Sequence, residues 1–188
     1  NFNTAKIKAS ILHEEQVEHP KLIELQNIID NETKQNQNVK IIVFNQYRDN
    51  ALDVIRKLNK IQNVKANIFV GQKKKGETGL SQKEQKQMLE DFRQGLFNVL
   101  VATSIGEEGL DIPKVDLVIF YEPIPSAIRS IQRRGRTGRQ EKGRVIILMT
   151  KGTRDEAYRW VAHNKEKKMY KNLANLRKKL NFSYYERK

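Results

Sequence analysis

The chain has 188 residues, enough for one well-packed domain or one domain with an extension, but not comfortably for two. Its 36 lysines and arginines against 22 aspartates and glutamates give a formal charge of +14, which favours a polyanionic partner such as nucleic acid, although a lysine-rich surface also serves solubility alone. Absence of cysteine excludes disulfides, thiolate nucleophiles and Cys-ligated zinc, and no apolar run reaches the roughly 18 residues of a membrane span, so we expect a soluble, intracellular protein without a membrane partner.

The three histidines do not indicate a metal site. His13, His19 and His163 have no carboxylate at a recognised metal-binding spacing. We interpret them as ordinary surface or helix-end residues and predict that no metal is bound.

The first predicted elements are a helix and a buried strand. Residues 20–34 carry apolar side chains at helical spacing, and Pro20 suits the first helical position. Residues 39–44 form a β-branched apolar run, which is typical of a parallel strand covered on both faces.

A second helix and strand, followed by a well-delimited helix, come next. Residues 47–59 have one apolar face and predict a helix, and residues 64–70 predict a strand. Ser81 and Glu84 form a capping box that begins the following helix, and Gly95 predicts a left-handed cap at its end.

Three further strands are predicted at residues 98–102, 116–121 and 144–149, with the segment 126–134 between the last two. A second capping box, from Thr153 to Glu156, follows the last strand. Strands that alternate with helices in this way are parallel and joined by right-handed crossovers. The predicted fold class is three-layer α/β with a mainly parallel sheet.

The composition changes at His163, after which nine lysines and arginines stand against two glutamates. Apolar residues spaced 4, 3 and 4 apart predict an amphipathic helix with a basic outer face: Met169, Leu173, Leu176 and Leu180. Such a helix could pack on its own domain, on a neighbouring domain or along a phosphate backbone.

Two loops that follow predicted strands carry the chemistry. In parallel sheets ligands bind at the carboxyl ends of the strands. Residues 103–113 place two hydroxyls and two glycines there, which is suited to donating hydrogen bonds to phosphate. Residues 132–139 contain four arginines, whose mutual repulsion is costly unless an anion lies between them. The sequence therefore predicts a phosphate site.

A third segment has the glycine spacing of a phosphate-binding P-loop but not its chemistry. In residues 71–78, Glu77 occupies the position of the essential lysine, and its carboxylate would repel phosphate. We reject an ATP site there and interpret its three lysines as a basic loop that either contacts nucleic acid or is simply solvated.

Together these motifs resemble the second RecA-like domain of superfamily 2 helicases over about residues 20–165. Residues 41–47 resemble motif IV, 102–113 motif V and 132–139 motif VI. Residues 70–72, 79–82, 107–111 and 151–157 are more narrowly similar to archaeal Hef, a helicase-associated nuclease for forked DNA that is related to the Fanconi anaemia group M family.

The resemblance implies roles for particular residues. The catalytic residues would be Arg136 and Arg139, as arginine fingers for the γ-phosphate of ATP, and Gln132, which couples the nucleotide to domain closure. Asp111 and Gly109 would join both arginines in nucleotide binding. Contacts to the nucleic-acid strand would come from six residues: Asn45, Gln46, Gly71, Gln72, Thr103 and Ser104.

The resemblance also implies an organisation in three parts. Residues 1–18 would be an extension or the end of an inserted domain, residues 19–162 the RecA-like domain, and residues 163–188 a basic helical extension. ATP and Mg²⁺ would be bound mainly by a first RecA-like domain of the same polypeptide, because no lysine-containing P-loop or acidic box stands here, so this piece alone should be inactive as an ATPase.

Forked or branched DNA would be the main partner, and a downstream nuclease domain is a further possibility. The location would be the cytoplasm, at the nucleoid, for an archaeal protein and the nucleus for a eukaryotic one. Two alternatives remain open: a double-stranded RNA helicase of the RIG-I or Dicer type, since residues 107–111 fit that group too, and a non-catalytic nucleic-acid-binding module.

Overall fold

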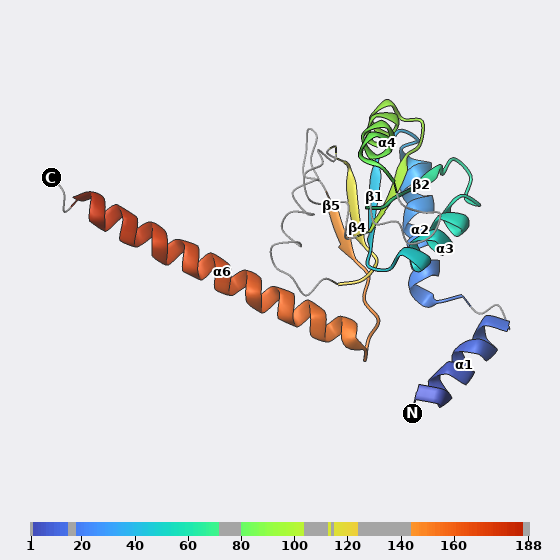
Figure 1. Ribbon diagram of the computed structural model, residues 1–188, viewed down its shortest axis with the longest axis horizontal. Coiled ribbons are helices and arrows are strands. Elements are labelled where there is room, and N and C mark those ends of the chain that lie inside the picture. Colours follow the sequence, from blue (N-terminus) through green and yellow to red (C-terminus); the bar gives the residue numbers. More distant parts are fainter. Residues whose placement is uncertain are drawn as a thin grey trace.

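The computed structural model describes residues 2–14, 18–71, 80–103, 113, 115–123 and 144–185, and these form a parallel sheet flanked by helices (Figure 1). The strands are β1 (Ile41–Asn45), β2 (Ala66–Phe69), β3 (Val99–Thr103), β4 (Leu117–Phe120) and β5 (Arg144–Ile147). Their order across the sheet is β2-β3-β1-β4-β5, and every neighbouring pair is parallel. All five predicted strands are confirmed, with ends displaced by at most two residues.

Helices cover both faces of this sheet, which confirms the three-layer α/β class. α2 (Pro20–Gln35) and α3 (Arg48–Leu58) pack on one face, where their apolar side chains form a single core with alternate residues of β1, β3 and β4. α4 (Gln82–Gln94) packs on the other face through Leu89 and Phe92. The central strands β1 and β3 are buried along their whole length, as their β-branched runs predict.

The local signals at the helix ends act as expected. Pro20 is at the start of α2, where the Nδ1 atom of His19 accepts a hydrogen bond from the backbone N–H of Lys21 at 3.1 Å. Ser81 and Glu84 form the reciprocal capping box of α4, and Gly95 ends that helix with φ of 82°. Since a positive φ is costly for residues with a Cβ, glycine is the suitable residue at this position.

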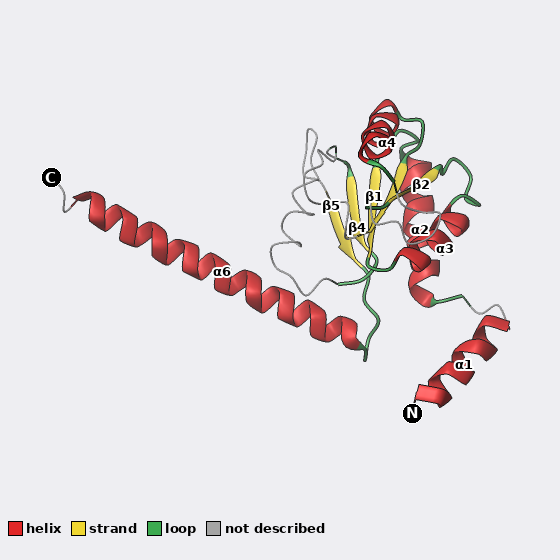
Figure 2. Cartoon of the chain, in the orientation of Figure 1, coloured by secondary structure: helices red, strands yellow, loops and turns green. Residues whose placement is uncertain are grey.

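Two helices extend beyond the layers around the sheet (Figure 2). α1 (Phe2–Glu14) precedes α2, and α6 (Arg154–Tyr185) begins after β5 and runs away from the sheet. α6 is one uninterrupted helix across His163, because the segment holds neither glycine nor proline. None of the described helices is long and apolar enough to cross a membrane.

The cap of α6 differs in one detail from the predicted box. The Thr153 hydroxyl accepts a hydrogen bond from the backbone N–H of Asp155 at 3.2 Å, one residue earlier than the predicted partner Glu156. It also donates to the carbonyl of Thr150 at 2.7 Å, which closes the turn after β5.

Several sequence predictions fall outside the described residues. They are the P-loop-like segment from Gln72 onward, most of motif V at residues 104–112, the segment 126–134, and motif VI at residues 132–139.

Candidate functional site

The carboxyl ends of the strands bring together the described part of the predicted site. β1 ends at Asn45 and β3 at Thr103, and these two residues are direct register partners on neighbouring strands. β2 lies on the other side of β3 and leads into Gly71. Motif IV and the start of motif V therefore meet at one edge of the sheet, although 58 positions separate Asn45 from Thr103 in the sequence.

Two polar atoms at this edge are buried and unpartnered among the described residues: the Nδ2 atom of Asn45 and the hydroxyl of Thr103. The exposed fractions of the two residues are 0% and 3%. The other side-chain atom of Asn45, Oδ1, accepts a hydrogen bond from the backbone N–H of Tyr47 at 3.0 Å, which orients the amide. A buried donor without an acceptor costs about 1–3 kcal/mol, so two adjacent ones favour an external acceptor.

A third atom in this class, Oε2 of Glu18, has a different explanation. Its carboxylate precedes α2, and the other oxygen is paired with Lys57 on α3. The charge of Glu18 is thus compensated by Lys57, and Glu18 does not belong to the group of residues that follow the strands. The pair at Asn45 and Thr103 remains the feature that points to a ligand.

Glu122 holds the loop that follows β1. One carboxylate oxygen accepts a hydrogen bond from the backbone N–H of Gln46 at 3.0 Å, and the other accepts from Nδ2 of Asn50 at 3.3 Å. Burial raises the pKa of Glu122, although the hydrogen bond from Gln46 and the charge of Lys21 oppose this rise. Glu122 was missed by sequence reasoning because it acts across 76 positions of the chain.

A buried amide fixes the chain next to Gly71. The Gln85 side chain, on α4, donates to the carbonyl of Val70 at 2.9 Å and to that of Leu80 at 3.3 Å. The Arg48 guanidinium, at the start of α3, donates to the carbonyl of Gly71 at 3.4 Å. The backbone at Gly71 is therefore held from both faces of the sheet.

The structure thus places four predicted strand-contacting residues at the carboxyl edge: Asn45, Gln46, Gly71 and Thr103. The remaining predicted site residues lie outside the described residues: Gln72, Ser104, Gly109, Asp111, Gln132, Arg136 and Arg139. The described chain also reaches this edge at Pro123, shortly after the end of β4. Groups of acidic residues and histidines able to hold a metal ion are absent from the described part of the chain.

Several known proteins are similar to this chain in sequence, and one of solved structure is similar to it in fold. A Pyrococcus furiosus structure of the Hef helicase domain is 58% identical, with a TM-score of 0.65, over 80% of this chain and 30% of that one. A Methanocaldococcus jannaschii protein, provisionally named an ATP-dependent RNA helicase, is 44% identical over 93% of this chain. The Neurospora crassa ATP-dependent DNA helicase mph1 is 45% identical over 74% of it.

The chain corresponds to only part of these relatives, spanning 22% of the Methanocaldococcus protein and 12% of the Neurospora one. The family model described as the helicase conserved C-terminal domain matches residues 20–141, which include all of the central strands and the three predicted motifs. This chain therefore belongs to the helicase conserved C-terminal domain family, the RecA-like second motor domain of superfamily 2 helicases.

Proposed function

We propose that the chain is the second motor domain of an ATP-dependent DNA translocase that acts on forked or branched DNA. The observation that carries this proposal is the pair of buried, unpartnered donors at Asn45 and Thr103. They lie at the edge where motifs IV and V meet, in a chain 58% identical to a Hef helicase domain.

The described residues suit the binding of a strand's phosphates. The Nδ2 atom of Asn45 and the hydroxyl of Thr103 donate hydrogen bonds, and phosphate oxygens accept them without reading the base sequence. Glu122 acts on this site indirectly, because it fixes the backbone directly after Asn45. A rigid support of this kind keeps the donors in place while the strand moves past them.

The nucleotide half of the mechanism rests on the resemblance. Arg136 and Arg139 would reach the γ-phosphate of ATP bound with Mg²⁺ to the first motor domain, and Gln132, Asp111 and Gly109 would complete the composite site. ATP supplies the free energy that drives closing and opening of the two motors. Alternate tightening and loosening at Asn45 and Thr103 would then move the protein along one strand.

The decisive experiment measures DNA-stimulated ATPase activity in the full-length polypeptide with both motor domains. We expect Arg136→Ala and Arg139→Ala each to lower the rate by roughly 10³- to 10⁵-fold, as loss of an arginine finger does in other nucleotide hydrolases. Arg56→Ala, which changes an exposed arginine on α3, is the matched control and should leave the rate unchanged. Retention of full activity by both finger variants would disprove the assignment.

The substrate class needs its own test, because the Methanocaldococcus relative is named as an RNA helicase. Forked DNA, linear DNA duplex and RNA duplex are compared as activators of the same ATPase. We expect forked DNA to give the largest stimulation. Preferential stimulation by RNA duplex would assign the protein to the RNA helicases instead.

A further inference from the structure

A hollow lies between the residues that follow β5 and the first turns of α6, and none of the helicase motifs includes its lining residues. It measures about 400 Å³ and is lined by Met149, Glu156, Arg159, Trp160 and His163. Ligand-binding pockets in proteins commonly measure about 300–1,000 Å³. Trp160 is 66% exposed and Met149 is 47% exposed, so a large apolar surface is open there.

The hollow has a fixed wall, because the start of α6 is tied to the core. Asp155 forms an ion pair with Lys21 of α2 and accepts a hydrogen bond from the backbone N–H of Thr150 at 2.9 Å. The Lys21 ammonium in turn lies 5.7 Å from the centre of the Tyr121 ring, at the end of β4. Trp160 is just over one turn beyond Asp155, so its backbone is held in place.

Trp160 presents an aromatic surface with polar groups around it. Its indole meets the His163 ring edge to face, with centroids 6.4 Å apart and an interplanar angle of 80°. Glu156, four residues before Trp160, lies on the same side of the helix, and Arg159 lines the same hollow. The two side chains supply a hydrogen-bond acceptor and a donor. An aromatic face bordered by both kinds of polar group suits a flat heterocycle such as a nucleobase.

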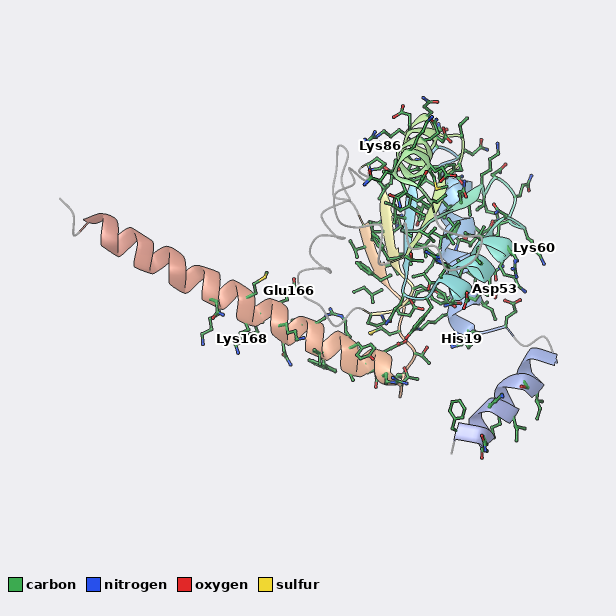
Figure 3. The ribbon with its side chains drawn as sticks, viewed as in Figure 1. His19, Asp53, Lys60, Lys86, Glu166 and Lys168 are labelled. Carbon is green, nitrogen blue, oxygen red and sulfur yellow. The ribbon has the colours of Figure 1, made fainter. Side chains whose placement is uncertain are left out.

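Positive charge continues along the helix in line with the indole. Lys167 and Lys171 follow Trp160 by seven and eleven residues, about two and three helical turns, so they project on the same side. Both lysines are exposed. By the same helical spacing Glu166 and Lys168, which Figure 3 labels, project from other sides of α6. This face of α6 thus begins with an aromatic side chain and continues with two cationic ones. Proteins that bind single-stranded nucleic acid combine these two kinds of contact.

We propose that this hollow binds an unpaired nucleobase, which stacks on Trp160 while Lys167 and Lys171 contact the adjoining phosphates. Met149 follows β5 at the same edge of the sheet that holds Asn45 and Thr103, so a strand bound there can continue toward α6. The inference rests on the proposed function only in taking nucleic acid as the partner.

Intrinsic fluorescence gives a direct test, because Trp160 is the single tryptophan of the chain. The 188-residue chain is titrated with oligothymidylate, and binding is followed in parallel by the anisotropy of a labelled oligonucleotide. We expect tryptophan quenching that saturates together with the anisotropy change. Binding without any change in tryptophan fluorescence would overturn the proposal.

Substitutions separate stacking from simple exposure of apolar surface. Trp160→Ala should weaken oligothymidylate binding by about 5- to 150-fold, and Trp160→Phe should retain most of it, because any aromatic face can stack on a base. Val161→Ala changes the next exposed apolar residue and should leave affinity unchanged. Circular dichroism verifies folding of all three variants. Equal affinities for wild type and Trp160→Ala would contradict the proposal.

Two single lysine substitutions test whether the strand follows a defined path along α6. Lys167→Ala should reduce the slope of log affinity against log salt by about 1, whereas Lys165→Ala, on another side of the helix, should change it less. Equal effects would argue for diffuse attraction to α6 and against a defined path.

A protein partner for the hollow is the remaining outcome to distinguish. If Trp160→Ala lowers the ATPase of the full-length polypeptide but leaves oligothymidylate affinity unchanged, the hollow packs against protein and our proposal fails. The binding assay uses no ATP, so its result is independent of Arg136 and Arg139. If Trp160→Ala leaves oligothymidylate binding unchanged, the proposed motor function still stands. If the Arg136 and Arg139 variants keep full ATPase activity, stacking on Trp160 is still tested by the binding assay.

Discussion

The two edges of the sheet differ in how completely the hydrogen bonds of their polar side chains are satisfied. At the amino edge, side chains bond to the backbone: Asn98 accepts from the N–H of Lys65 at 2.9 Å and donates to the carbonyl of Asn63 at 2.8 Å. At the carboxyl edge, Asn45 and Thr103 each keep a buried polar atom without a described partner.

This difference indicates that the amino edge stabilises the fold, whereas the carboxyl edge binds a ligand. Asp116 accepts from the N–H of Lys40 at the amino edge, and Asn59 exchanges two hydrogen bonds with Ala66 there. Such bonds tie the ends of neighbouring elements together and stabilise the fold. Unpaired donors at the opposite edge lower stability and are useful only when a ligand accepts their hydrogen bonds. In an open parallel sheet that edge is also where ligands bind.

Asparagine substitutions at the two edges should give the largest difference. Asn98→Ala should lower the free energy of unfolding by about 1–3 kcal/mol, because two hydrogen bonds are lost. Asn45→Ala should cost about 1 kcal/mol in stability but weaken DNA binding roughly 10- to 100-fold, the value of a hydrogen bond to a charged group. Urea unfolding of the chain and DNA binding by the full-length polypeptide measure these quantities. The contrast fails if Asn98→Ala harms binding as much as Asn45→Ala does.

Threonine-to-valine substitutions should change stability in opposite directions. Thr103→Val removes an unpartnered hydroxyl and should raise the free energy of unfolding by up to about 1 kcal/mol. Thr33→Val is the matched control, since its buried hydroxyl donates to the carbonyl of Ile29 at 2.9 Å, and it should lower stability by about 1 kcal/mol. Unfolding in urea measures both. Destabilisation by Thr103→Val would mean that its hydroxyl has a partner within the protein.

Asp155 should show the smallest effect, and only above acidic pH. Burial raises its pKa, but hydrogen bonds from Lys21 and Thr150 and the charge of Lys21 together hold it below the ordinary value of 3.8. The charged Asp155 therefore stabilises the fold fully at pH values above its ordinary pKa of 3.8. This contribution is lost as the pH falls through the lowered pKa of the folded protein. Asp155→Asn should cost about 1 kcal/mol or less at neutral pH. A cost that persists in full at about pH 2, below the ordinary carboxyl pKa, would show that the charge of Asp155 is irrelevant.

Local patterns predicted much of this fold from the sequence. The β-branched runs gave the strands, and Ser81 and Gly95 marked the ends of α4, because these signals act within a few residues. The nucleic-acid contacts at Asn45, Gln46, Gly71 and Thr103 were predicted from the resemblance of their motifs to superfamily 2 helicases. That these residues lie together follows from their position after parallel strands.

Other features depend on contacts between distant residues and could not be predicted. Glu122 supports the loop after β1 across 76 positions, and no local pattern announces that bond. The exposure of Trp160 depends on the direction in which α6 leaves the core, set by Asp155 and Lys21. The role of Arg136 and Arg139 in ATP hydrolysis stays a prediction from motif VI.

The amide of Gln85 has a practical consequence for protein engineering. One side chain grips the carbonyls of Val70 and Leu80, so the two ends of the intervening segment are held together independently of what joins them. Closing a chain between anchored ends adds only a small entropic cost as its length grows. Residues 73–79, which follow the predicted strand contacts Gly71 and Gln72, are therefore a natural place to insert a reporter or exchange sequences between relatives, with β2 and α4 held in place by one buried glutamine.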